Sequence, residues 1–186
     1  FDATGNTVYV GGNFTTARPA GAAAGTNEVS RSNLLAYNLT TGVLNTTWTP
    51  TANGEVLALA ASPDKSRIYI GGSFTNVNGQ IRNRIAAVDP TTGALIGPFQ
   101  PKPDATVKAI AATNSTVYFG GIFSSVGGTA RVKVAAAQAS DGALLSWNPV
   151  LAGGNVNAIA ISPDSSKVAI GGSFTSTNGS SNPGYG

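Results

Sequence analysis

The sequence predicts an all-β protein made of repeated units of four antiparallel strands, the blades of a β-propeller. Three observations lead to this fold class: a motif that occurs four times, a spacing of about 50 residues between most of its copies, and the strand-like composition around each copy. Four-stranded units repeated at this period are typical of propellers. A solenoid is the alternative array, but its repeats are usually shorter and its strands run parallel.

The recurring motif is a short apolar run that ends in two glycines, with a phenylalanine two residues later. Its copies are residues 8–14, 68–74, 117–123 and 168–174. The β-branched and aromatic residues of the run favour a strand, the second of each unit. A glycine pair at a strand end indicates a bulge, or a place where another backbone comes too close for a Cβ atom. We expect the phenylalanine to be buried between units.

The first strand of each unit precedes this motif. It is predicted at residues 107–112, with copies at 56–61 and 156–161. These segments alternate valine or leucine with alanine, which suits a strand crowded near a propeller axis. In two copies a Ser-Pro-Asp turn follows, where proline presets φ and the aspartate can bind its own backbone.

After the motif we expect a polar loop, such as residues 75–80, and then a third strand at 85–89, with copies at 34–38 and 134–138. A tight turn with a glycine leads to the fourth strand, because a hairpin asks for positive φ there. The fourth strand ends in an aromatic residue followed by a proline. The pairs are Trp48 with Pro50, Phe99 with Pro101, and Trp147 with Pro149. We expect the aromatic rings to pack between blades.

The repeat predicts a single propeller fragment over residues 1–186. It divides into a partial blade at 1–50, blades at 51–101 and 102–149, and a partial blade at 150–186, about three and a half in all. Pairing the two ends would duplicate a second strand. The sequence therefore predicts a window of a larger propeller of roughly six to eight blades, with the other blades supplied by the same polypeptide.

The combined pattern resembles the delta-60 repeats of bacterial exported and cell-surface proteins. It consists of the motif at 68–74, an Asn-Gly loop, the run Arg-x-Arg-Ile-Ala-Ala-Val-Asp, a Thr-Thr-Gly turn and an aromatic-x-Pro ending. A looser similarity is to kelch repeats, which share the glycine pair but not the recurring phenylalanine. The resemblance covers nearly the whole chain and implies an extracellular or cell-surface location. It brings no catalytic motif.

Composition excludes several classes of chemistry. The chain has no cysteine, histidine or methionine, so it offers no thiol or imidazole for a nucleophile or a metal, and we expect no cofactor and no metal site. The excess of three positive charges is too small and scattered to indicate a nucleic-acid partner. No apolar run approaches the roughly 20 residues of a membrane span. Most carboxylates fall at turns, so no pair for glycoside hydrolysis stands out.

Arg31, Arg82 and Arg131 occupy the same position in three successive units. The functional interpretation is a row of guanidinium groups that holds carboxylates, sulfates or phosphates. The structural interpretation is a capping contact to loop carbonyls, repeated because the unit is repeated. We expect the loops after the second strands to share one face with the links between blades. The candidate ligand-binding residues on that face are Arg18, Glu28, Arg31, Asn78, Gln80, Arg82, Arg84, Arg131 and Lys133.

One loop breaks the repeat. Sixteen residues separate Phe14 from Arg31, whereas seven separate Phe74 from Arg82. Such insertions either collect on a binding face or drift neutrally. The sequence thus predicts a non-enzymatic binding, adhesion or scaffold module that contacts a protein or a polar, anionic glycan. The alternative is part of a propeller enzyme, for example one acting on polysaccharide, whose catalytic residues lie in other blades.

Overall fold

The computed structural model describes residues 2–178 and 180–181, which form strands and turns but no helix. The strands make four three-stranded sheets and three two-stranded hairpins, all antiparallel among the described residues. The all-β prediction is confirmed. The described part of the chain holds no helical segment with the length and hydrophobicity that crossing a bilayer requires.

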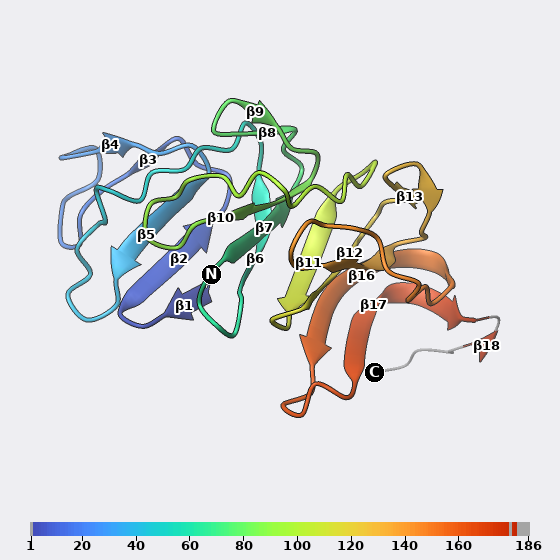
Figure 1. Ribbon diagram of the computed structural model, residues 1–186. Helices are drawn as coiled ribbons and strands as arrows, with labels where there is room; N and C mark the ends of the chain where they lie inside the picture. The colour runs from blue at the N-terminus through green and yellow to red at the C-terminus, as the bar shows by residue number, and fades with distance from the viewer. Residues whose placement is uncertain (1, 179, 182–186) are drawn as a thin grey trace.

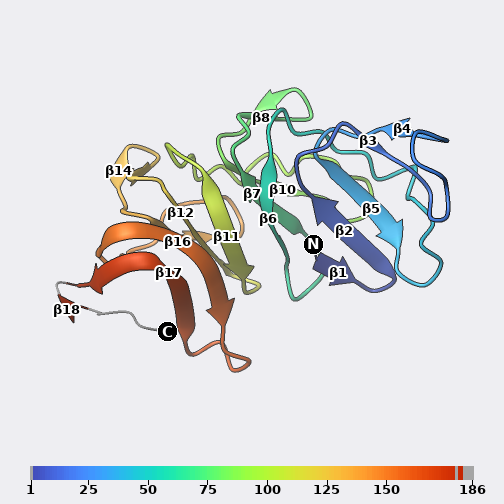
Figure 2. The ribbon, with the colours of Figure 1, turned by 180° about the vertical axis from the view of Figure 1, so that it is seen from behind.

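Each three-stranded sheet is the centre of one unit, and the units are numbered in chain order. Unit 1 has β1 (Asp2–Thr4), β2 (Thr7–Gly11) and β5 (Leu34–Asn38); unit 2 has β6 (Val56–Ala61), β7 (Ile68–Gly72) and β10 (Ile85–Val88); unit 3 has β11 (Val107–Ala112), β12 (Thr116–Gly121) and β15 (Val134–Gln138); unit 4 has β16 (Leu151–Ile161), β17 (Val168–Thr177) and β18 (Ser180–Ser181). The units stand side by side in this order (Figure 1), as the view from behind also shows (Figure 2). The first strands β6, β11 and β16 contact one another in series.

The first three predicted strands of units 2 and 3 are confirmed, but the predicted fourth strand is wrong. A single bridge remains after each tight turn, such as the one from Tyr37 to Leu44. In unit 1 the chain turns away at once, because the Asn45 side-chain oxygen accepts the backbone N–H groups of Thr47 and Trp48. The Trp48 ring is then fully buried instead of extending an edge strand.

The segments predicted as polar loops are hairpins. They are β3 (Thr16–Ala17) with β4 (Val29–Ser30), β8 (Asn76–Val77) with β9 (Gln80–Ile81), and β13 (Ser125–Val126) with β14 (Thr129–Ala130). Asn78 and Gly79 make the two-residue turn of the second hairpin, with φ of 50° and 75°. Asn-Gly between paired residues is a strong signal for this turn, so the hairpin was readable from the sequence.

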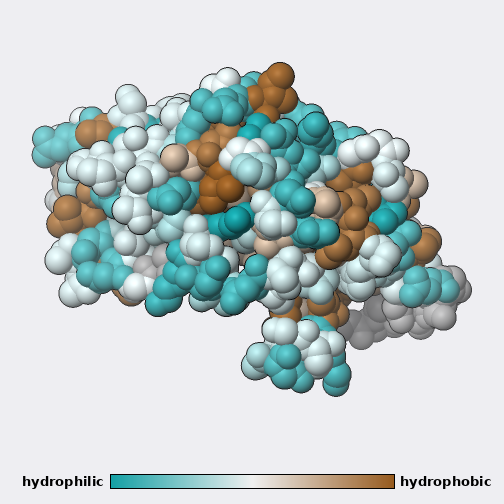
Figure 3. Space-filling model, viewed as in Figure 1, coloured by the Kyte–Doolittle hydropathy of each residue, from teal (hydrophilic) through white to brown (hydrophobic). Residues whose placement is uncertain are grey.

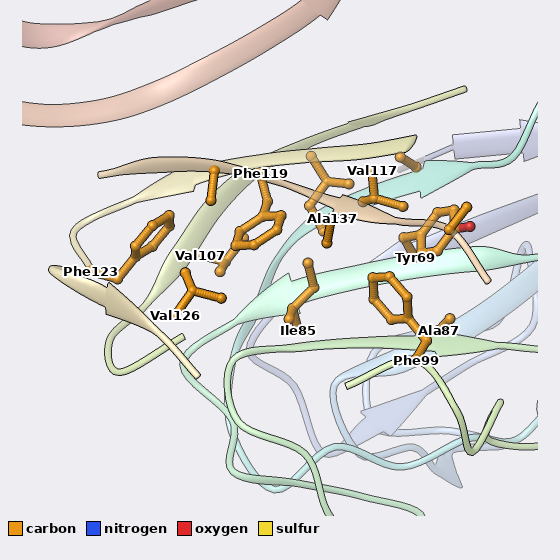
Figure 4. Close-up of a cluster of buried hydrophobic side chains, with 14 residues drawn as sticks. Tyr69, Ile85, Ala87, Phe99, Val107, Val117, Phe119, Phe123, Val126 and Ala137 are labelled. Carbon is orange, nitrogen blue, oxygen red and sulfur yellow. The ribbon is translucent and has the colours of Figure 1, made fainter. Parts of the chain in front are cut away.

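The core lies between neighbouring sheets. Figure 4 shows the cluster between units 2 and 3, where Tyr69 and Phe99 from one side face Val117 and Phe119 from the other. Phe74 and Phe123 are buried, at 1% and 0% exposed, which confirms the expectation for them. The equivalent Phe14 and Phe174 are only partly buried.

In units 2 and 3 the glycine pair serves both of the predicted purposes, one per glycine. A Cβ atom at Gly71 would lie 2.7 Å from Val107 Cγ1 of the next unit, so the first glycine lets the units approach. A Cβ atom at Gly72 would lie 2.0 Å from the backbone oxygen of Glu55, the residue directly before β6 of its own unit. The register of β6 against β7 shifts at this place, so the second glycine accommodates a bulge.

Candidate functional site

The links between units and the hairpins lie together, as predicted. Ala52, in the link that enters unit 2, bridges to Val77, and Pro103 bridges to Val126 in unit 3. The tight turns meet one another at the opposite ends of the strands, where the backbone N–H of Asp64 donates to the Asn114 side chain. The hairpins follow the upper edge of Figure 1, and the turns between first and second strands follow its lower edge.

The three equivalent arginines bind backbone carbonyls. Arg82 donates through Nη1 to the Ile81 carbonyl at 2.7 Å and through Nη2 to the Gly97 carbonyl at 2.9 Å. Arg31 and Arg131 make the same two kinds of contact. Burial lowers the pKa of the Arg82 guanidinium below its ordinary value. These are the capping contacts of the structural interpretation, and anion binding by these groups stays a prediction.

A hollow of about 490 Å³ opens beside Arg82, between the β8–β9 hairpin and the link into unit 3. Its lining combines amides, two cationic side chains and apolar side chains: Gln80, Ile81, Arg82, Asn83, Ile85, Gln100 and Lys102. We call it the link hollow. A hydrophobic patch stands out over the β8–β9 hairpin in Figure 3, where Ile81 is 73% exposed. The link hollow therefore offers amide and cationic groups next to an exposed apolar surface.

Two predicted site residues, Gln80 and Arg82, line the link hollow. Asn78 does not line the link hollow. Its side chain accepts the Thr51 N–H and donates to the Gly93 carbonyl. The guanidinium of Arg84 donates to the Ser73 carbonyl. The equivalent residues of unit 3, Arg131 and Lys133, do not line this hollow.

The insertion carries the other two predicted residues, and Arg18 is not placed as expected. Glu28 is exposed just before β4. Arg18 and the residues after it instead lie across the sheet of unit 1, where the Tyr37 hydroxyl donates to the Arg18 carbonyl at 3.0 Å. The expectation that Arg18 shares a face with Arg82 and Arg131 is wrong, because the insertion runs toward the tight turn after β5.

Gln100 and Lys102 were missed by the sequence reasoning. Both lie in the link that follows Phe99, and the link was expected on the hairpin side. The sequence did hold a signal for them, because the link carries an amide and a cationic side chain. The prediction placed the link on this face but did not count its side chains among the site residues. Lys102 has φ of 61°, and its carbonyl accepts the Gly127 N–H, so its backbone is fixed against the next hairpin.

Asp104 anchors the following hairpin. Its carboxylate accepts the Ser124 N–H at 2.9 Å, the Ser124 hydroxyl at 2.6 Å and the Ser125 hydroxyl at 3.0 Å. Burial raises the pKa of Asp104, but the hydrogen bonds from Ser124 and Ser125 outweigh it and bring the pKa down to about 2. In unit 2, Asn53 makes equivalent contacts with Thr75 and Asn76 through an amide.

This pair predicts that the contact between the link and the hairpin is acid-labile in unit 3 but not in unit 2. A carboxyl whose pKa is lowered by folding stabilises the fold above its ordinary pKa near 4, and that stability is lost as pH falls through about 2. Asp104→Asn is expected to flatten the acid side of the stability curve between about pH 4 and 2. Urea unfolding across that range checks this. Asn53→Asp is the converse variant and should steepen the same limb.

The other well-bound carboxylates belong to turns. The Ser62 hydroxyl and the Ser66 backbone and hydroxyl hold the pKa of Asp64 below its usual range. The equivalent bonds, led by the Ser162 hydroxyl, lower the pKa of Asp164 to about 2. These carboxylates are ionised acceptors for turn donors, which is the turn role that the sequence predicted.

Comparison with models of known protein families finds no match, and a search of curated proteins finds none either.

Proposed function

We propose that the chain is a set of β-propeller blades, similar to delta-60 repeats, in a secreted or cell-surface bacterial protein, and that it acts as a non-enzymatic binding module. The serial contacts of the first strands support the propeller, because the first strand of each blade lies nearest the axis of such a ring. The repeated packing of aromatic residues between units supports it too.

The ligand is a polar, anionic glycan contacted at the link hollow. The observation that carries this assignment is the combination of Lys102 and Gln80, whose side chains make no hydrogen bond within the described residues, with the exposed apolar surface of Ile81. An ammonium group attracts carboxylate or sulfate, and amides bind sugar hydroxyls. Arg82 also lines the hollow, and its two Nη atoms bind backbone carbonyls.

Reversing one charge tests this assignment. Lys102→Glu is expected to raise the Kd for polygalacturonate, a carboxylated polysaccharide, by about three- to tenfold at low salt. Lys65→Glu is the matched control, because Lys65 has nearly the same φ, 60° against 61°, but lies in the tight turn of unit 2. Dextran, which is neutral, should bind no better to one variant than to the other.

Isothermal titration at two salt concentrations measures these affinities. Equal weakening by Lys102→Glu and Lys65→Glu would mean that the general positive charge attracts the polysaccharide and that the link hollow does not. Binding that survives Lys102→Glu unchanged would place the ligand elsewhere on the chain. Unchanged melting temperatures of both variants would show that neither result comes from unfolding.

A further inference from the structure

The second strands of units 1 and 2 carry equivalent buried tyrosines, and among the described residues only one of the two hydroxyl groups has an acceptor. The Tyr9 hydroxyl of unit 1 donates to the Pro90 carbonyl of unit 2 at 2.8 Å. Tyr69 of unit 2 is 0% exposed, and its buried hydroxyl makes no hydrogen bond in that part of the chain. A buried hydroxyl without a partner costs free energy, because folding removes the water that bound it.

Arg67 occupies the acceptor that Tyr69 would otherwise use. The carbonyl equivalent to that of Pro90 is the Ala139 carbonyl of unit 3. The Arg67 guanidinium donates to it, and also to the Ser140 carbonyl at 3.3 Å. A guanidinium has donors only, so Arg67 cannot accept the tyrosine proton itself. The arginine therefore leaves the Tyr69 donor free.

Tyr69 lines a hollow of about 130 Å³ between the turn after the first strand of unit 2 and the turns of unit 3. The lining also includes Asp64, Arg67, Asn114 and Ser140, and we call this site the turn hollow. In Figure 4 the hydroxyl oxygen of Tyr69 lies at the end of the ring that points out of the buried cluster. Asp64, Asn114 and Ser140 are exposed, so the turn hollow opens to solvent at its rim. Its volume is about four times the share of one water molecule in the liquid.

Both signs of charge line the turn hollow. The Oδ1 atom of Asp64 accepts the Ser62 hydroxyl and the Ser66 N–H and hydroxyl, whereas its Oδ2 atom accepts no hydrogen bond from the described residues. Burial raises the pKa of Tyr69 more than the Arg67 guanidinium lowers it, so the hydroxyl keeps its proton. An anion is repelled by Asp64 and a cation by Arg67. The lining therefore favours a neutral ligand that both donates and accepts hydrogen bonds.

We propose that the turn hollow binds the hydroxymethyl group of a neutral sugar. The sugar hydroxyl accepts the Tyr69 O–H and donates to the Asp64 carboxylate, and a hydroxyl does both at one oxygen. The small volume admits this group and leaves the sugar ring at the rim, where Asn114 and Ser140 offer an amide and a hydroxyl. This site is separate from the link hollow, because the two share no lining residue.

The probes are two neutral sugars that differ by this one group. Methyl α-D-glucopyranoside carries a hydroxymethyl group, and methyl α-D-xylopyranoside has the same ring without it. Titration of the glucoside into the isotope-labelled protein is expected to give saturable shifts in the backbone amide signals of residues 64–67, 114 and 140. The xyloside should bind at least about fivefold more weakly, because it leaves the Tyr69 hydroxyl unpaired. Sodium acetate should not displace the glucoside, because Asp64 repels its carboxylate.

The two equivalent tyrosines give the matched variants. Tyr69→Phe should weaken glucoside binding at least about fivefold and leave the melting temperature unchanged or higher, because no hydrogen bond within the described residues is lost. Tyr9→Phe removes the hydroxyl that donates to Pro90, so it should lower the melting temperature by about 2–4 °C and leave the Kd within about twofold. Far-ultraviolet spectra show that both variants fold.

Arg67→Thr tests why the hydroxyl is free. It puts into unit 2 the residue that Thr7 supplies in unit 1. The variant keeps the Tyr69 hydroxyl but frees the Ala139 carbonyl to accept it, so glucoside binding should weaken as much as in Tyr69→Phe. Binding that survives Arg67→Thr unchanged would contradict the proposal.

The proposal is also overturned if the glucoside does not bind, if the xyloside binds equally well, if acetate displaces the glucoside, or if the shifts map to the link hollow. A Tyr69→Phe variant that keeps the glucoside Kd and melts lower, as Tyr9→Phe does, would mean that water alone fills the turn hollow. Polygalacturonate carries a carboxylate in place of the hydroxymethyl group, so its binding at the link hollow is tested independently of these outcomes.

Discussion

Gly121→Ala is expected to lower the free energy of unfolding by about 3 kcal/mol or more. A Cβ atom at this position would lie 2.0 Å from the backbone oxygen of Thr106 and 3.0 Å from Val107 Cα. Val107 begins β11, the strand that pairs with β12, and Thr106 comes directly before it. Side chains of β11 are held in the core between units 2 and 3. Backbone cannot rotate away as a side chain can, so the bulge must open and the ladder must shift.

Gly12→Ala is the control, because Gly12 is the equivalent glycine of unit 1. Among the described residues its added Cβ atom would meet only the ring of Phe14, at 3.1 Å, and this ring is partly exposed and able to turn. We expect a loss below about 1 kcal/mol. Urea unfolding followed by tryptophan fluorescence measures both, with the m value checked for constancy. Equal losses in the two variants would mean that the close backbone approach at the bulge does not explain why the second residue of the pair is glycine.

The glycine pair also shows where sequence reasoning about the fold stops. Two glycines at a strand end predict either a bulge or a close approach, and the structure has one of each. Which glycine does which depends on segments far away in the chain, Val107 for Gly71 and Glu55 for Gly72. The strand positions themselves were predictable, because each depends on a local apolar run.

The prediction of a fourth strand was wrong for a related reason. Its apolar residue and its aromatic residue look like strand composition, yet the Asn45 side chain turns the backbone and the buried site for Trp48 lies in the next unit. A local pattern cannot show that an aromatic ring gains more from a buried site in unit 2 than from an edge strand. The hairpins were missed although their Asn-Gly and Gly-Gly turns were visible.

Two of the seven residues that line the candidate site were predicted from the sequence. Gln80 and Arg82 follow from the hairpin that every unit repeats. Lys102 comes from the link, and its place beside Gln80 depends on how the link pairs with the next hairpin. Arg18 was misplaced because an insertion has no equivalent in the other units, so the repeat says nothing about where it folds.

Phe74→Ala is expected to cost about 3 to 5 kcal/mol, as truncation of a large buried side chain does. The ring is 1% exposed and packs in the cluster between units 1 and 2 with Ala52, Val56 and Val77. Those three come from the link, the first strand and the hairpin of unit 2, so the ring joins the hairpin to the sheet. The cavity left by alanine cannot close unless the β8–β9 hairpin moves.

Phe14→Ala changes the same motif position in unit 1, where the ring is only partly buried against Ala17 and Leu35. We expect less than half the loss, because less apolar area leaves water on folding and solvent can enter the gap. Urea unfolding of the two variants gives the comparison. A loss under about 1 kcal/mol for Phe74→Ala would place the ring outside the core that joins the units. If Phe14→Ala loses less than half of what Phe74→Ala loses, then burial in the cluster between units, and not the motif itself, makes Phe74 stabilising.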